Sequence, residues 1–426
     1  MDPEPTVLPL GTARRWTKVA ATFFAVHFTQ QVVTLATGLL FIRYLSIEEF
    51  AIYTMATSVL LTFAFATDLG SSSALMHFFH QSQLGKEPYA NMANAVLSLR
   101  RWMFVAGAPV AVAILAVWGR ASGLSAPMIA LASVLVVATV WVQVQGTTRI
   151  VVLRLEGEYA RSYRAEVLAA LARLGAASAV IAFGLTTAIW ALATALVSAC
   201  ALAWVAHEGR IPRAATSVRA LQHRVVRYLA PALPSAVYFA IQGQLVIWCA
   251  AWFGNLTLVA NIGALGRLGL IVGAFGGLSQ VVFLPRLVQI TDEGLFARRL
   301  VQFGAILAVM AGALVAASVA APYAFLWLLG ESYDSLTMEL PLIVLAAGLS
   351  LVGGYLGAVA NARSWNRLQP AALLVMMAAQ AAMVVWLQLD TTLGVAWFAV
   401  GSAAAGLASQ LAIVTTGLVR PRWVTW

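Results

Sequence analysis

The sequence predicts an all-α polytopic membrane protein with about twelve transmembrane helices. Its 426 residues are 62% hydrophobic and only 10% charged, and the mean hydropathy is +0.87. Water-soluble proteins carry about 25% charged residues, so this chain cannot cover a water-facing surface with charge. Twelve spans of about 20 residues would use roughly 250 residues, which leaves no room for a sizeable soluble domain.

Twelve apolar runs define the expected spans. The first is too long for the core of a signal peptide, so we interpret it as a retained helix. The stretch from 167 to 206 would be about 60 Å long as one helix, twice the hydrocarbon thickness, so it must turn back, most simply at residues 184–187. The expected spans are 19–42, 51–68, 102–118, 126–145, 168–185, 188–205, 228–253, 257–284, 301–321, 337–359, 371–389 and 393–419.

The distribution of Lys and Arg predicts that both termini are cytoplasmic. With the N-terminus inside, 23 of the 26 Lys and Arg residues, Arg173 among them, fall in inner segments. The outer segments hold only Arg43 and Arg120, and Arg267 lies inside a span. Positive charge marks cytoplasmic loops, so topology explains the net charge of +10. Nucleic acid is not an expected partner, because no polar surface is left to carry a basic patch.

The two halves of the chain align at an offset of 208 residues. This offset pairs Ala56 with Ala264 and Ser71 with Ser279, and it places the second span on the eighth. Because transporters are commonly built from repeats, we expect an N-terminal six-helix lobe (1–205), a basic cytoplasmic linker (206–228) and a C-terminal six-helix lobe (229–426).

Three segments resemble the polysaccharide transporters of the multidrug/oligosaccharidyl-lipid/polysaccharide (MOP) flippase superfamily. Residues 41–79 resemble the family's first-to-second helix signature, with Ala51 where the family usually has Gly. Residues 231–288 resemble its seventh and eighth helices and end in its usual Leu-Pro-Arg. The segment LLGESYDSL is similar to its ninth-to-tenth helix connector. The resemblance implies a MOP/MATE-like fold of two six-helix lobes.

The resemblance also implies a function, a flippase of the bacterial inner membrane. Such a protein moves undecaprenyl-pyrophosphate-linked oligosaccharide repeat units across the membrane for O-antigen, exopolysaccharide or capsule synthesis, by alternating access of its lobes. The implied partners are the lipid-linked glycan, the lipid bilayer, a polysaccharide polymerase and a chain-length regulator, and a monomer is the expected state. A cation-coupled multidrug exporter and a peptidoglycan-precursor flippase of the same superfamily stay open as alternatives.

Arg267 is the first candidate for substrate binding. It lies about ten residues into the eighth span and therefore about 15 Å deep. An Arg at that depth costs about 2.5–3.5 kcal/mol on insertion scales, so it needs a water-filled cavity or a partner. A guanidinium suits the pyrophosphate oxygens of the implied substrate. The alternative is a structural pair with a buried carbonyl or with Asp68.

Polar stripes on the first and seventh spans supply the other binding candidates. Residues at i, i+3, i+4 and i+7 share one helix face, and a polar face must avoid lipid. In a two-lobe carrier these faces would line a central cavity, or they would simply hydrogen-bond neighbouring helices. The candidates are His27, Gln30, Gln31 and Thr34 in the first span and Ser235, Tyr238 and Gln242 in the seventh.

Asp68, at the end of the second span, has two candidate roles. A carboxylate near a membrane cavity can titrate with a shifted pKa and so couple an ion to transport. The sequence Asp-Leu-Gly-Ser-Ser is also typical of a helix end followed by a cap.

The sequence offers no catalytic, metal-binding or nucleotide-binding constellation. The longest expected outer loop, 322–337, has two acids but no His, Lys or Arg, and no G-x-x-x-x-G-K-[ST] motif occurs. A membrane glycosyltransferase or glycan polymerase would need catalytic groups in large outer loops. We therefore expect a protein that is not an enzyme and that uses no cofactor.

Overall fold

The computed structural model describes residues 10–83, 89–208, 218–230, 233–279, 283–290, 292–365 and 367–420. The protein is 89% helical, and the described part contains no strand. The predicted all-α fold class is confirmed.

The helices follow one another with short connections. The N-terminal half contains α1 (Leu10–Tyr44), α2 (Ile47–Asp68), α3 (Ser71–Gln83), α4 (Tyr89–Ala121), α5 (Ala126–Leu155), α6 (Tyr159–Ala182), α7 (Ala188–Val205) and the short 3-10 helix η1 (Ala206–Glu208). Helix α8 (Val218–Leu229) follows. The C-terminal half contains α9 (Leu233–Gln242), α10 (Leu245–Phe253), α11 (Leu256–Leu278), α12 (Leu284–Val288), α13 (Glu293–Ala320), α14 (Pro322–Leu329), η4 (Glu331–Tyr333), α15 (Glu339–Ala362), α16 (Gln369–Trp386) and α17 (Thr392–Val419).

The number of long apolar helices identifies a multi-pass membrane protein. Ten helices in the described part are long and apolar enough to cross a membrane, and the bent pair α9 and α10 would add an eleventh span. Helix α1, which covers the expected first span, is continuous over 35 residues. The hairpin expected at residues 184–187 is confirmed, because α6 ends at Ala182 and α7 begins at Ala188.

The seventh expected span, 228–253, is wrong as a single helix. It is divided into α9 and α10, whose directions differ by 57°. The break falls at Gly243 and Gln244, and a sharp kink of this kind is typical of a helix interrupted at glycine. The residues just ahead of it form the separate helix α8.

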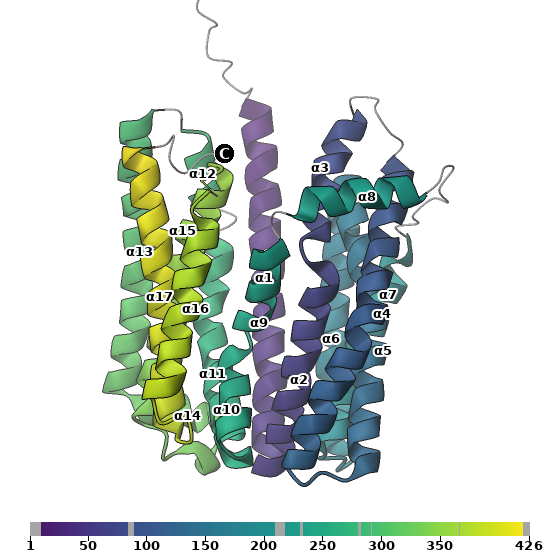
Figure 1. Ribbon diagram of the computed structural model, residues 1–426, viewed down its shortest axis with the longest axis vertical. Helices are drawn as coiled ribbons and strands as arrows, with labels where there is room; N and C mark the ends of the chain where they lie inside the picture. Colours follow the sequence, from purple (N-terminus) through teal and green to yellow (C-terminus); the bar gives the residue numbers. More distant parts are fainter. Residues whose placement is uncertain are drawn as a thin grey trace, which may run out of the picture.

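Two groups of helices stand side by side, with α1 between them (Figure 1). We call α1–α7 the N-terminal group and α9–α17 the C-terminal group. Helix α1 contacts α6 of its own group and α11 of the other. Helix α8 lies across one end of the bundle and α14 lies at the opposite end (Figure 1). We refer to these as the α8 end and the α14 end. The lobe boundaries at residues 205 and 229 stay a prediction.

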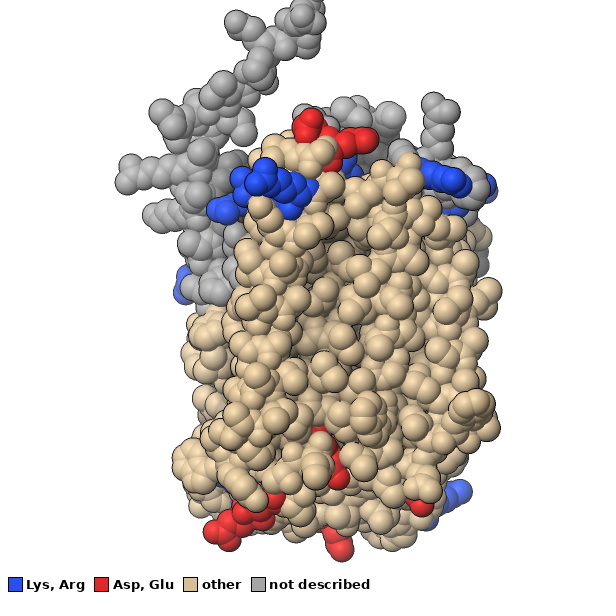
Figure 2. Space-filling model, turned by 90° about the vertical axis from the view of Figure 1, so that its left-hand side faces the viewer, with Lys and Arg blue, Asp and Glu red and all other residues tan. Residues whose placement is uncertain are grey.

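Charged side chains gather toward the two ends of the bundle. Figure 2 shows a broad band of other residues between them on the face in view. A band without charge matches the hydrocarbon core of a bilayer, where an ionised side chain is costly.

Side chains cap the first turns of several helices that start at the α14 end. The Ser46 hydroxyl accepts the backbone N–H of Glu49 at 3.2 Å, and the Asn255 side chain accepts that of Leu258 at 2.9 Å. The carboxylate of Glu49 in turn accepts the N–H of Ala188 at 2.6 Å, at the start of α7. These caps satisfy first-turn N–H groups that have no partner within their own helix.

Candidate functional site

Arg267 lies at the contact between the two groups of helices. It is the middle residue of α11, about 16 Å from either helix end. Its guanidinium carbon lies 5.9 Å from the centre of the Tyr53 ring on α2. Gly38 of α1 makes room for it, since a Cβ at position 38 would lie 3.0 Å from Cδ of Arg267. The side chain is therefore held by residues of the N-terminal group.

A second arginine, Arg173, meets the same tyrosine. Arg173 Nη2 donates to the Tyr53 hydroxyl at 3.0 Å, while its Nε is buried with no hydrogen-bond partner in the described structure. Arg173 lies 14 residues into α6, about 21 Å along the helix. The prediction that Arg173 belongs to an inner segment is wrong. It is a second cation deep within a span.

The two guanidinium groups share this site, and the described residues give them no counter-charge. They lie close enough to interact electrostatically, and that interaction is repulsive. In the described part of the chain, the ion pairs are Arg100–Asp68, Arg154–Glu166 and Arg161–Glu158, so neither Arg173 nor Arg267 has a carboxylate partner there. Two like charges in a region of low dielectric attract an anion strongly.

Asp68 is held inside the N-terminal group, away from Arg267. Its Oδ1 accepts the hydroxyls of Ser71 at 2.9 Å and Ser72 at 2.8 Å, and it lies 3.4 Å from Nη2 of Arg100. Arg100 also donates to Thr148 at 2.7 Å. A pair between Arg267 and Asp68 is therefore excluded, because the Asp68 carboxylate is engaged elsewhere. Ion coupling by Asp68 stays a prediction.

Among the described residues, no contact joins the predicted polar stripes to Arg267. Tyr238 is buried in the C-terminal group and donates to Gln380 at 3.0 Å, and Gln380 donates to Ser402 at 2.5 Å. Gln242 is the last residue of α9, directly before the break. Gln30 and Gln31 are half-buried on α1. The side chain of His27 lies outside the described part of the structure.

Two close contacts join the two groups of helices near Arg267. A Cβ at Gly263 of α11 would lie only 2.6 Å from Cγ2 of Thr54 on α2. The two helices therefore cross so closely there that only glycine fits. The Trp248 indole N–H on α10 donates to the Ser58 hydroxyl on α2 at 3.1 Å.

Arg43 adds a contact at the α14 end itself. It donates from Nη2 to the carbonyl of Trp327 at 2.6 Å and from Nε to that of Leu328 at 3.2 Å. Its guanidinium also lies 5.0 Å from the Trp327 ring centre. These contacts join the C-terminal end of α1 to the C-terminal end of α14.

Sequence reasoning found one of the two cations. Arg267 stood out because it lies in the middle of an apolar run. Arg173 also lies inside an expected span, 168–185, but it was grouped with the basic residues that precede it. Tyr53 contacts both cations, but the sequence does not single it out, because tyrosines are common in the cores of buried helices.

No protein-family model and no curated protein match this sequence. Solved structures do match it. An inward-facing multidrug resistance MATE family transporter of the MOP superfamily is 16% identical, with a TM-score of 0.67 over 95% of this chain and 98% of that one. The lipid II flippase MurJ, in an inward closed conformation, is 13% identical, with a TM-score of 0.67 over 93% of this chain and 87% of that one. The eukaryotic MATE transporter AtDTX14 is 13% identical, with a TM-score of 0.63 over 97% and 98%.

These likenesses define the fold. The chain has the helical architecture of the MOP-superfamily transporters, as its sequence resemblance implied. At 13–16% identity they do not define the substrate. The MATE transporters and MurJ act on different cargo under the same fold.

Proposed function

We propose that this protein is a flippase for lipid-linked oligosaccharides, and that its substrate is an undecaprenyl-pyrophosphate-linked repeat unit of a surface polysaccharide. The observation that carries the proposal is the Arg173–Tyr53–Arg267 site. A pyrophosphate offers several anionic oxygens, and planar guanidinium groups bind such oxygens through paired donors. The sugar part would meet amide and hydroxyl side chains, for which Gln30, Gln31 and Gln242 are the candidates.

The site favours an anionic cargo over a cationic drug. A cation-coupled exporter of positively charged drugs would need carboxylates where this chain places two arginines. A peptidoglycan-precursor flippase shares the anionic chemistry, and the likeness to MurJ supports it as the second candidate. The two flippase functions differ in the glycan that they carry, so the lipid that accumulates on depletion distinguishes them.

The arrangement of contacts supports alternating access with the α14 end closed. The inter-group contacts at Gly263 and Arg43 lie between the Arg173–Tyr53–Arg267 site and the α14 end. The TM-score to the inward-facing MATE transporter, 0.67, exceeds the 0.62 to its outward-facing form. The excess of Lys and Arg at the predicted inner side would make the α8 end cytoplasmic. In this proposal the pyrophosphate enters from the α8 end and leaves when the α14 end opens.

The proposal is tested by measuring where the lipid-linked glycan accumulates. In cells depleted of this protein we expect complete undecaprenyl-pyrophosphate-linked repeat units on the inner leaflet, together with loss of the surface polymer. Mass spectrometry of the accumulated lipid identifies the glycan. Unpolymerised units on the outer leaflet would point to a polymerase-type role, and unchanged lipid pools would refute a flippase function.

A further inference from the structure

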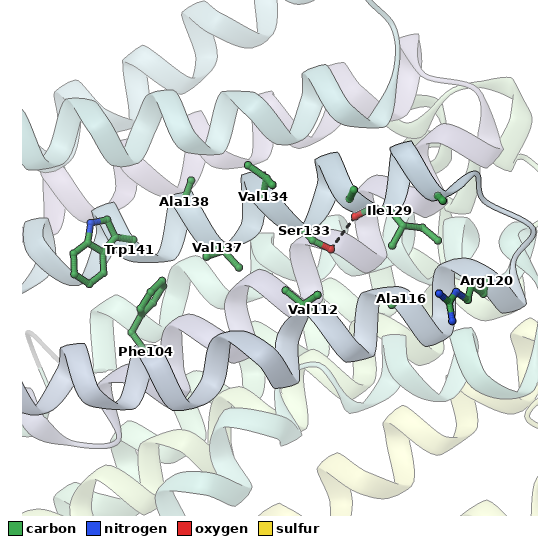
Figure 3. Close-up of a pocket in the computed structure, with 12 residues that line it drawn as sticks. Phe104, Val112, Ala116, Arg120, Ile129, Ser133, Val134, Val137, Ala138 and Trp141 are labelled. Atoms are coloured by element: carbon green, nitrogen blue, oxygen red, sulfur yellow. Dashed lines mark hydrogen bonds between the residues drawn. The ribbon is translucent and has the colours of Figure 1, made fainter.

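A cavity of about 650 Å³ lies between α4 and α5, apart from the Arg173–Tyr53–Arg267 site (Figure 3). These two helices supply its whole lining, which is almost entirely aliphatic and aromatic. Of its polar members, the Ser133 hydroxyl already donates to the Ile129 carbonyl at 2.8 Å. Apart from Arg120 at one end, this lining is almost entirely apolar, and an apolar cavity favours hydrocarbon over water.

The cavity is a groove that opens to the bilayer. Several of its lining residues are exposed on the outside of the bundle, Val134 at 62% and Trp141 at 40%. Its lining includes small side chains, among them Ala116, Ala130 and Ala138. We call this feature the α4–α5 groove.

The two ends of the α4–α5 groove differ in chemistry. Arg120, in the last turn of α4, marks one end of the groove in Figure 3. The junction of α4 and α5 lies at the α14 end of the bundle (Figure 1). Arg120 is exposed, and no described residue forms an ion pair or hydrogen bond with its guanidinium. At the other end Phe104 and Trp141 close the groove, with ring centres 5.0 Å apart. A cation at one end and an apolar groove that is open to the bilayer fit a phosphate head with a hydrocarbon tail.

The length of the groove distinguishes between kinds of lipid. From Phe104 to Arg120, α4 rises about 24 Å. One leaflet is only about 15 Å deep, half of a hydrocarbon core of about 30 Å. An acyl chain that stays within one leaflet reaches about 15 Å and would cover only part of the groove. A polyprenyl chain is long enough to fill it.

We propose that the α4–α5 groove binds the tail of a polyprenyl phosphate whose phosphate rests on Arg120. The choice of a polyprenyl lipid follows from the length of the groove, and it rests also on the proposed flippase function. The groove would then hold the carrier lipid in the leaflet at the α14 end, at a site separate from the one that binds the pyrophosphate during transport.

Photo-crosslinking of the full-length protein in phosphatidylcholine nanodiscs tests this proposal. The probe is undecaprenyl monophosphate with a photoreactive group in its tail, and the labelled peptides are mapped by mass spectrometry. Ala130→Phe fills the groove, and Arg120→Gln removes the cation. The matched control is Ala113→Phe, since Ala113 is exposed on α4 but does not line the groove. Thermal unfolding of each variant establishes that it is folded.

We expect labelling of wild-type protein within residues 104–141. Ala130→Phe should lower that labelling about tenfold and Arg120→Gln about threefold, corresponding to about 1.4 and 0.7 kcal/mol, while Ala113→Phe should leave it unchanged. Equal labelling of the two Phe variants would overturn the proposal. So would equal competition by phosphatidylglycerol or by farnesyl phosphate, whose chains are shorter.

The leaflet measurement separates this inference from the proposed function. Labelling confined to α1 and α11 would refute the groove even if the wild-type protein moves lipid-linked glycan. Labelling of the groove in a protein that moves no glycan would refute the flippase function and leave the groove standing as a lipid site.

Discussion

Arg100 and Arg267 both lie within the helical bundle, but their surroundings are opposite. Arg100 pairs with Asp68 and donates to Thr148, and all three residues belong to the N-terminal group. Arg267 lies against Tyr53 of the other group and near a second cation, Arg173. The first arginine has its charge balanced within one group, whereas the second is left unbalanced at the contact between groups.

The difference indicates what each arginine is for. A balanced arginine stabilises the local arrangement of α2, α3, α4 and α5. An arginine without a counter-charge lowers the stability of the fold, since burying an unpaired charge is unfavourable. Two such charges kept together destabilise the fold, so we expect them to serve a function, and binding an anion is the simplest one. Four predictions test this contrast.

Arg267→Ala should have the largest effect, lowering glycan transport at least about tenfold, because it removes charge-assisted hydrogen bonds worth about 1.5–3 kcal/mol. Arg267→Lys should retain part of the activity, since it keeps the charge but loses the planar donor pair. Transport is measured as glycan lipid reaching the outer leaflet, with protein abundance in the membrane as the control. Normal transport by the Ala variant would remove Arg267 from the mechanism.

Gly263→Ala should disturb the contact on which the Arg267 site depends. The new methyl group would overlap Thr54, and overpacking of this kind costs about 1–3 kcal/mol. Gly266→Ala is the matched control on the same helix, because a Cβ there meets nothing within 4 Å. Thermal unfolding in detergent should show a lower Tm for the first variant only. Equal Tm values would contradict the tight crossing.

Asp68→Asn should affect stability more than transport. It leaves the Arg100 guanidinium, whose side chain is 5% exposed, without its counter-charge. We expect a loss of about 1–3 kcal/mol in the free energy of unfolding, and transport reduced only as far as folded protein is lost. If instead transport disappears while Tm is unchanged, the Asp68 carboxylate takes part in transport itself, as ion coupling would require.

Arg43→Gln should have the smallest effect. It removes two hydrogen bonds to backbone carbonyls at an exposed position, each worth about 0.5–1.5 kcal/mol net. Spin labels at Tyr44 and Tyr323, both exposed, would report a larger share of long distances at the α14 end. Arg120→Gln is the control, because Arg120 is not part of that contact. Identical distance distributions would show that Arg43 does not hold the α14 end closed.

Periodicity and hydropathy predicted most of the fold, because a lipid solvent demands long apolar helices with internally satisfied backbones. The span 188–205 coincides with α7, and 393–419 nearly coincides with α17. The break between α9 and α10 escaped prediction, since Gly243 lies in an apolar run that looks continuous. Helix α8 was assigned to a linker because hydropathy does not detect a basic amphipathic helix.

The candidate site was harder to predict because it depends on pairings across the fold. A single Arg in a span can be recognised from its neighbours along the chain. Whether it has a carboxylate partner is decided by residues far away in sequence, as the pairing of Asp68 with Arg100 rather than Arg267 illustrates. The role of Tyr53 between Arg173 and Arg267 arises only when α2, α6 and α11 are assembled.

The tight crossing of α2 and α11 at Thr54 and Gly263 would act as a pivot if α11 tilted against α2. Gly263 lies seven residues from the α14-end start of α11 and fifteen from its other end, arms of about 10 Å and 22 Å. A rotation of about 10°, comparable to known subunit rotations, would move the short arm by about 2 Å and the long arm by about 4 Å. A tilt about this crossing would therefore move the α8 end of α11 about twice as far as its α14 end.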